Sequence, residues 1–373
     1  MILTPFSPEQ DSRAARLAAY IREAGAVADI AGVADLPLAS GPKGETGMRQ
    51  TRGRARQRWQ RYKRAWSFLA SRSSQYDQVV AVNCEVGIVS WLFRLIHTRR
   101  FHLVLDVYDH HADIFESRVL ASAFAVLELV AAALADTVVL PIRERVAQYP
   151  EWARSAVSGK ALFISNIGFE LPRTICTGTD GGQSPVSGDG TANVTRPLRI
   201  AYCGNVDYSR GLDTLIEAVE ASGGRWQLDI HGGGVALAEF ERLPAGGGSV
   251  RFHGPFRNAE LVERAGGAEL FWAAYDLRIA NNRYCDPNKF RDHIVVDVPI
   301  LTNPGHPLAD LVERSGSGFV VPLDAIALRD FLVTLQCKDL AERRPSVVQA
   351  GAVLSSVVAG NRAAGDRIAS GKG

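Results

Sequence analysis

The feature that most constrains the fold of this chain is a repeated alternation of short apolar runs with stretches whose apolar residues recur at helical spacing. The chain opens with an apolar run at residues 2–5, continues with a helical pattern at 12–23, and returns to an apolar run at 26–30. Strands and helices that alternate in this way form a parallel sheet with helices on both faces. The pattern therefore predicts an α/β fold made of doubly wound, Rossmann-like sheets. Ser12 and Arg13, at the start of the first helix, could contact a ligand, but we expect an exposed helix start there.

The alternation occurs twice, and one segment separates the two occurrences. Residues 172–197 consist largely of Gly, Ser, Thr and Asp, a composition typical of a loosely ordered linker. A chain of 373 residues is also long enough for two hydrophobic cores. We therefore expect an N-terminal Rossmann-like domain at residues 1–170, a flexible linker at 171–197, a second Rossmann-like domain at 198–340, and a helical tail at 341–373.

Composition and charge limit the class of protein further. The formal net charge is only +2, so the chain as a whole does not resemble a binder of polyanions. No apolar run approaches the ~20 residues that a membrane-spanning helix needs, and no signal peptide is expected after Met1. The five cysteines are scattered without metal-ligand spacing, which favours reduced thiols. We expect a cytoplasmic protein, and peripheral attachment to the inner face of the membrane remains open.

One segment departs from the balanced charge of the chain. Residues 43–64 are rich in Lys and Arg, with Glu45 as the only acidic residue, and aromatic residues such as Trp59 and Trp66 lie among or just beyond them. Cations interleaved with aromatic residues suit an anionic membrane surface, so we expect residues 43–69 to contact one. A solvated basic helix is the alternative. The same composition can bind nucleic acid, but we expect no nucleic-acid partner.

Residues 281–303 contain the most informative local pattern. A polar turn leads to Asn288 and Lys289 at the expected start of a helix, which Pro299 ends before a short apolar run at 299–302. A helix start and a lysine together attract an anion. Asp292, one turn later, can accept hydrogen bonds from a sugar diol. An anion site beside a diol acceptor suits a nucleotide diphosphate, although an ordinary helix start with solvated side chains has the same pattern.

A second pattern of this kind begins the second half of the chain. An apolar run at 198–202 leads into the turn containing Gly204 and Asn205, and Arg210 precedes a helical pattern at 212–221. A strand, a glycine turn and a helix with a cation at its start can hold a phosphate group. Taken alone, this pattern is only weakly specific.

Both patterns resemble one family. The segment GNVDYSRGLDTLIEA, residues 204–218, is similar to the G-x(5)-K/R-G-x-D-x-L-I-E-A segment of GT-B glycosyltransferases of group 1, also called family 4. DPNKFRDHIVVDVPIL, residues 286–301, resembles their S-P-N-K-L-F-E-Y-M-A-A-G-K-P-V-I segment. The chain differs at Tyr284, where many members have a glutamate, and at Val295, Val296 and Asp297, where the family has Ala-Ala-Gly.

The resemblance implies the GT-B fold, two Rossmann-like domains facing each other across a cleft, and a donor site in the second domain. Arg210 takes the place of the cation that binds the diphosphate, and Asp292 that of a glutamate that holds the ribose. The donor-binding residues implied are Gly204, Asn205, Arg210, Asn288, Lys289, Phe290 and Asp292. The diphosphate is held by cations and helix ends, so no metal and no cofactor are expected.

Candidate catalytic residues follow the expected strand at 101–107. Asp109 and His110 lie where a strand of a doubly wound sheet opens onto the ligand crevice. Asp109 or His110 could act as a base in an inverting transferase, whereas in a retaining one His110 would contact the donor sugar. A polar loop with Asp113 as a helix cap is the alternative. His110 and His111 are adjacent and would point in opposite directions at a strand end, which disfavours a metal site.

The sequence therefore predicts a metal-independent, hexosyltransferase-like enzyme that moves a sugar from a nucleotide-diphosphate-sugar to a saccharide or a lipid-linked saccharide, as in the synthesis of bacterial surface or exopolysaccharides. Two alternatives remain. One is a catalytically silent GT-B protein that binds a nucleotide-sugar, which Tyr284 and Asp297 suggest. The other is a GT-B sugar epimerase.

Overall fold

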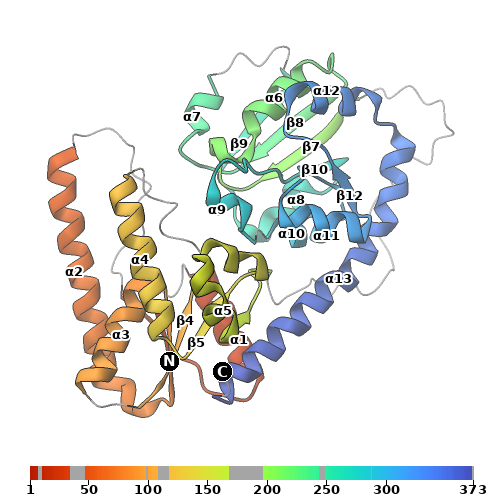
Figure 1. Ribbon diagram of the computed structural model, residues 1–373. Helices are drawn as coiled ribbons and strands as arrows, with labels where there is room; N and C mark the ends of the chain where they lie inside the picture. Colours follow the sequence, from red (N-terminus) through yellow and green to blue (C-terminus); the bar gives the residue numbers. More distant parts are fainter. Residues whose placement is uncertain are drawn as a thin grey trace. The chain divides into compact units, whose positions relative to one another are not determined.

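The structure of the chain is a computed structural model (Figure 1). It describes residues 1–6, 11–33, 47–97, 100–107, 117–167, 196–242, 248–286 and 288–371, with the side chains of residues 12, 47–58, 280, 345 and 348 excepted. The chain divides into two compact units. One comprises Met1–Phe169 together with Val357–Gly373, and the other comprises Glu170–Ser356. Each unit is built around one six-stranded sheet.

The sheet of the first unit is parallel, with the strand order β2-β1-β3-β4-β5-β6. Its strands are β1 (Ile2–Thr4), β2 (Ile30–Gly32), β3 (Gln78–Val82), β4 (His102–Asp106), β5 (Thr137–Leu140) and β6 (Ala161–Phe163). The order turns back between β1 and β3. A doubly wound sheet opens a crevice for ligands at such a point, beyond the carboxyl ends of its strands.

Helices cover both faces of this sheet, because successive residues of its strands are apolar on opposite faces. Leu105 of β4 belongs to a core that includes residues of α3 and α4, whereas its neighbour Val104 belongs to a core that includes residues of α1. The helices of the unit are α1 (Ser12–Glu23), α2 (Gly47–Arg72), α3 (Cys84–Ile96), α4 (Arg118–Leu134) and α5 (Glu151–Gly159). Within the described part of the chain, no helix is long and apolar enough to cross a membrane.

The sheet of the second unit is also parallel, with the order β12-β11-β10-β7-β8-β9. Its strands are β7 (Leu198–Cys203), β8 (Trp226–His231), β9 (Val250–Gly254), β10 (Leu270–Trp272), β11 (Ile300–Thr302) and β12 (Gly318–Val320). Here the order turns back between β7 and β10, so these two strands flank the expected ligand crevice.

The helices of the second unit surround this sheet (Figure 1). They are α6 (Leu212–Glu220), α7 (Leu237–Phe240), α8 (Leu261–Ala265), α9 (Ala280–Arg283), α10 (Lys289–Val295), α11 (Pro307–Ser315) and α12 (Ala325–Thr334). Trp226 and Trp272 are buried in the core shared with α6 and α12. The Nε1–H group of Trp226 donates a 2.7 Å hydrogen bond to the carbonyl oxygen of Leu332, so this indole is satisfied as well as buried.

The last helix, α13 (Cys337–Ala369), begins in the second unit and ends in the first. Asn361 is 2% exposed in the first unit. Its Oδ1 accepts a 2.8 Å hydrogen bond from the backbone N–H of Ser165, and its Nδ2 donates at 3.0 Å to the hydroxyl of Tyr20. Ile368 joins the core that contains β1 and α1. The final turns of the chain therefore complete the unit that the first residues begin.

The structure confirms the predicted class of fold and corrects two local predictions. Arg13 is not exposed, as the next section describes. The strand expected at 26–30 lies instead at Ile30–Gly32, where Ile30 pairs with Ile2, because a turn with Gly25 at φ +81° follows α1.

Candidate functional site

The loops that follow β7 and β8 are hydrogen-bonded to each other at the carboxyl edge of the second sheet. The N–H group of Gly204 donates a 2.9 Å hydrogen bond to the carbonyl oxygen of His231, and that of Val206 donates at 2.9 Å to Gly233. Gly232 adopts φ +152°, and a Cβ atom there would lie 1.7 Å from the carbonyl oxygen of Gly204. Only glycine allows so close an approach. The two glycine turns therefore form one backbone surface at the carboxyl ends of β7 and β8.

Lys289, the first residue of α10, reaches back to the end of β7. Its Nζ donates a hydrogen bond to the carbonyl oxygen of Cys203 and lies 3.2 Å from Oδ2 of Asp292. The same Nζ lies 5.9 Å from the ring centroid of Tyr202 and 5.7 Å from that of Phe271. Since Tyr202 belongs to β7 and Phe271 to β10, the ammonium group lies where the strand order turns back.

Asp292 is buried and paired with two cations. Its side chain is 9% exposed, and Oδ1 lies 3.0 Å from Nη2 of Arg291 while Oδ2 faces Lys289. Phe290 is 0% exposed and packs edge-on against His293 at 5.2 Å, so its side chain is closed to a ligand here. Burial lowers the pKa of His293 to about 4, and the neutral ring helps to fix α10 from inside.

Asn288 and Asn205 lie at the starts of the two predicted motifs. Oδ1 of Asn288 is buried and has no hydrogen-bond partner among the described residues, and its side chain does not cap α10. Nδ2 of Asn205 donates a 2.5 Å hydrogen bond to Oδ2 of Asp207, and the carbonyl oxygen of Asn205 accepts from the hydroxyl of Tyr202 at 2.5 Å. Asn205 therefore shapes the loop, while the amide oxygen of Asn288 is available for a partner.

Arg210 ends the short 3-10 turn η5 (Tyr208–Arg210) that leads into α6. Its guanidinium carbon lies 4.8 Å from the ring centroid of Tyr275. Its Nε lies 3.6 Å from Oδ2 of Asp207, and its carbonyl oxygen accepts a 2.9 Å hydrogen bond from Nε1 of Trp272. The guanidinium is thus held beside Tyr275 and Asp207, and Trp272 of β10 holds the backbone of Arg210.

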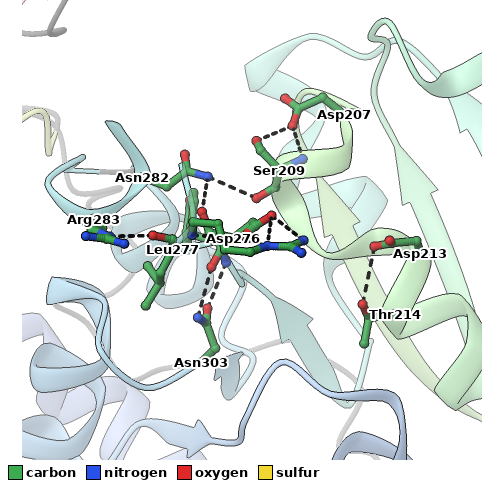
Figure 2. A network of polar contacts seen from close by, with 11 residues as sticks. Asp207, Ser209, Asp213, Thr214, Asp276, Leu277, Asn282, Arg283 and Asn303 are labelled. Atoms are coloured by element: carbon green, nitrogen blue, oxygen red, sulfur yellow. Dashed lines mark hydrogen bonds and ion pairs between the residues drawn. The ribbon is translucent and has the colours of Figure 1, made fainter. Parts of the chain in front are cut away.

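A polar network attaches this loop to the segment after β10 (Figure 2). Asp207 accepts a hydrogen bond from the backbone N–H of Ser209 at 2.8 Å. The carbonyl oxygen of Ser209 in turn accepts from the N–H of Asp276 at 2.8 Å and from Nδ2 of Asn282 at 3.3 Å. Asn303, at the end of β11, holds the backbone of Tyr275 through two hydrogen bonds. The loop that carries Arg210 is therefore tied to the segment after β10, and that segment is tied to the end of β11.

Aromatic rings at the turn-back point of the second sheet lie beside both cations. Burial raises the pKa of Tyr202 above its ordinary value, and the charge of Arg210 opposes that shift. Lys289 approaches the ring of the same residue. Tyr275, which the sequence prediction omitted, lies with its ring centroid 4.8 Å from the guanidinium carbon of Arg210. Its position directly after β10, at the turn-back point of the sheet, is the signal that could have identified it.

The first unit has a different arrangement at the carboxyl edge of its sheet. Arg13 is 5% exposed, and its Nη2 lies 2.7 Å from Oδ1 of the fully buried Asp106. Its Nη1 donates to the carbonyl oxygen of Ile164 at 2.9 Å and to Oδ1 of Asn166 at 2.7 Å. The expected exposed position was wrong because the buried carboxylate at the end of β4 requires a counter-charge.

Asp109 and His110, the predicted catalytic residues, lie outside the described residues, as do Asp113 and His111. Among the residues that the structure does describe, no group of three or more His, Cys, Asp or Glu side chains is placed to hold a metal ion.

Comparison with known proteins identifies the fold. No protein-family model matches the chain, and no curated protein matches it in sequence. Among solved structures, HepE from Anabaena in complex with UDP-glucose has a TM-score of 0.58 and 16% identity, with 82% of each chain covered. WaaG, a glycosyltransferase involved in lipopolysaccharide biosynthesis, has a TM-score of 0.57 and 17% identity, with 99% of each chain covered.

A third similar structure is an α,α-trehalose-phosphate synthase (UDP-forming) from Burkholderia xenovorans, in complex with glucose-6-phosphate. Its TM-score is 0.61 at 12% identity, over 95% of this chain and 96% of that one. All three are GT-B glycosyltransferases, so the GT-B fold predicted from the sequence is confirmed. At such identities the likeness concerns the fold alone.

Proposed function

We propose that the protein is a glycosyltransferase that transfers a sugar from a nucleotide-diphosphate-sugar to a hydroxyl group of a saccharide. The observation that carries this proposal is the position of two cations at the turn-back point of the second sheet. Arg210 lies beside Tyr275, directly after β10, and Lys289 lies beside Tyr202 of β7. A ligand crevice lies at such a point in doubly wound sheets. The similar HepE structures contain UDP and UDP-glucose, which supports a nucleotide-sugar donor.

The two cations suit the chemistry of the donor. Transfer breaks the bond between the sugar and the diphosphate, so negative charge grows on the departing phosphate oxygens. Arg210 and Lys289 would stabilise that charge, and preorganised cations are effective there because they need little rearrangement during the reaction. No metal and no cofactor are part of the proposal. Asp292 would hold the ribose diol, within the reach of its hydrogen bonds.

The acceptor side of the proposal rests on Asp109 and His110. If the enzyme inverts the sugar configuration, Asp109 takes the proton of the acceptor hydroxyl. If it retains the configuration, His110 contacts the donor sugar instead. Asp109→Asn should then abolish turnover with donor affinity intact in the first case, and His110→Ala should be the more damaging change in the second.

A lipid-linked acceptor would bring the protein to an anionic membrane through residues 43–69. In α2, Trp59 is 60% exposed, and Nζ of Lys63 lies 5.7 Å from its ring centroid. An exposed aromatic ring beside a cation suits the headgroup region. Sedimentation with vesicles should show binding that needs anionic lipid, fades with salt because the attraction is screened, and weakens in Trp59→Ser. Equal binding to neutral vesicles would contradict this contact.

A panel of nucleotide-sugars, scored for transfer and hydrolysis with and without saccharide acceptors, tests the proposed activity. Transfer with one donor class supports it. Tight binding of a nucleotide-sugar without turnover on any acceptor would support the catalytically silent alternative, and interconversion of free sugar epimers would support an epimerase.

A further inference from the structure

Cys285 forms a pair with His306 beside the proposed donor site. Its Sγ lies 3.3 Å from Nε2 of His306 and 3.5 Å from the carbonyl oxygen of Asn282. Cys285 is partly exposed, whereas the imidazole of His306 is 1% exposed. The pair joins the turn before α10 to the loop before α11, two segments that the sequence separates.

The proton of His306 faces the sulfur. Nδ1 accepts a 3.0 Å hydrogen bond from the backbone N–H of Leu308, which caps α11. In a neutral ring the proton is then on Nε2, which faces both the sulfur of Cys285 and the backbone of Asn282. Burial, reinforced by the charge of Arg210, lowers the pKa of His306 to about 3, so the ring is neutral near pH 7. An N–H donor directed at sulfur stabilises the thiolate, while the carbonyl oxygen of Asn282 can accept from the thiol.

The surroundings of Cys285 connect it to Arg210. His306 stacks on Tyr275 with ring centroids 4.4 Å apart, and the guanidinium of Arg210 lies 4.8 Å from that same ring. A partly exposed thiol that contacts an N–H donor, with a cation on the same set of stacked rings, has the environment of a reactive cysteine.

The other described cysteines differ from Cys285. Cys84 and Cys203 are buried, and burial raises the pKa of each to about 12, which disfavours reaction. Cys337 is exposed, and no histidine contact is found for it among the described residues. Cys337 is therefore the matched control, because it is an exposed thiol for which the described residues show no contact like that of Cys285 with His306.

We propose that Cys285 is a thiol modification site at which a low-molecular-weight disulfide such as oxidised glutathione controls access to the proposed donor site. The thiolate of Cys285 attacks one sulfur of the disulfide. A new disulfide bond forms to that half, the original S–S bond breaks, and the other half leaves as a thiolate that takes a proton from water. A dithiol reductant reverses the exchange.

The adduct would act through charge and volume. Glutathione carries net negative charge at neutral pH, so its adduct competes with a diphosphate for Arg210. Cys285 also lies shortly before Asn288 and Lys289 in the chain. A bulky adduct at Cys285 would move the segment with these two residues away from the end of β7. Because this control concerns the donor site, it rests on the proposed function, whereas the reactivity of the thiol does not.

The test uses the full-length chain with oxidised glutathione, and peptide mass spectrometry measures the rate of adduct formation at each cysteine. We expect Cys285 to react at least about tenfold faster than Cys337 near neutral pH. His306→Gln should slow the reaction at Cys285 and leave that at Cys337 unchanged. Bound UDP should protect Cys285, because coupling between two ligands is reciprocal.

Calorimetry with UDP then measures the control itself. We expect the adduct at Cys285 to weaken UDP binding, dithiothreitol to restore it, and Cys285→Ser to remove the sensitivity while Cys337→Ser keeps it. Equal reaction rates at Cys285 and Cys337 would overturn the proposal that Cys285 is a modification site. This comparison uses the unaltered chain, so it does not depend on whether the His306 variant folds. Unchanged UDP affinity of the adduct would overturn the control, and failure of the unmodified chain to bind any nucleotide diphosphate would overturn the proposed function and the control together.

Discussion

Lys289 and Asp292 are paired across one turn of α10, with 3.2 Å between Nζ and Oδ2, and the lysine at the same time donates to the carbonyl oxygen of Cys203. The pair therefore links a helix start to the end of β7. This linkage holds a cation beside β7 and β10, at the turn-back point where a doubly wound sheet binds its ligand. Four predictions test the site and its support.

The first concerns Arg210, whose guanidinium is fixed beside Tyr275. A charge-assisted hydrogen bond contributes roughly 1.5–3 kcal/mol, so Arg210→Ala should weaken UDP binding by about one to two decades. Calorimetry measures the affinity. Arg329→Ala is the matched control, because Arg329 lies on α12 and pairs with its neighbour Asp330. Unchanged affinity in Arg210→Ala, or an equal loss in the control, would remove Arg210 from the donor site.

The second prediction concerns Gly204. A Cβ atom there would lie 3.2 Å from Nζ of Lys289 and 3.2 Å from the hydroxyl of Tyr202. Gly204→Ala should therefore displace the lysine and weaken UDP binding by roughly fivefold, or about 1 kcal/mol. Gly351→Ala, in α13, meets no atom within 4 Å and should leave the affinity unchanged. Full affinity in Gly204→Ala would mean that the position of Lys289 does not matter for binding.

The third prediction separates a binding role of Asp292 from a structural one. Asp292→Asn keeps the shape of the side chain but removes the charge that faces Lys289 and Arg291. We expect UDP affinity to fall by about tenfold and the melting temperature to fall by only about 2–4 °C. Calorimetry and thermal unfolding measure the two effects. A larger loss of stability with intact affinity would make Asp292 a structural residue.

The fourth prediction concerns pH. His293 is completely buried, and burial lowers its pKa from 6.5 to about 4. Between these values the unfolded chain binds more protons than the folded chain, so stability is full above pH 6.5 and is lost as pH falls toward 4. At pH 5 this one group should lower the free energy of unfolding by about 1–2 kcal/mol relative to pH 7.

Urea unfolding at pH 7 and pH 5 checks the effect of His293. The drop in stability between the two values should be smaller in His293→Gln than in the original chain. His231 and His306 keep their own lowered pKa values in that variant, so some acid sensitivity should remain. An identical drop in both proteins would exclude His293 as a source of the pH dependence.

Sequence patterns predicted those features of the fold that depend only on residues close together in the chain. The alternation of apolar and helical stretches predicted two doubly wound sheets, since each strand and helix must bury its own apolar residues. The glycine turn with Arg210 and the turn with Lys289 were also readable, because both follow the chain directly. The pattern did not predict that Arg13 is buried against Asp106, or that Tyr275 contacts both Arg210 and His306.

The sequence by itself determined the class of fold, the strand ends at which Arg210 and Lys289 lie, and the chemistry that two cations at such ends can support. Only the tertiary structure decided which distant residues meet: Cys285 with His306, and Asn361 with Tyr20. The physical reason is that periodicity reports which face of an element is buried, whereas contacts between elements depend on the order of strands in the sheet and on the paths of the loops that join them. A side chain can be placed on a face from its own neighbours in sequence, but its partner is known only once the sheet has formed.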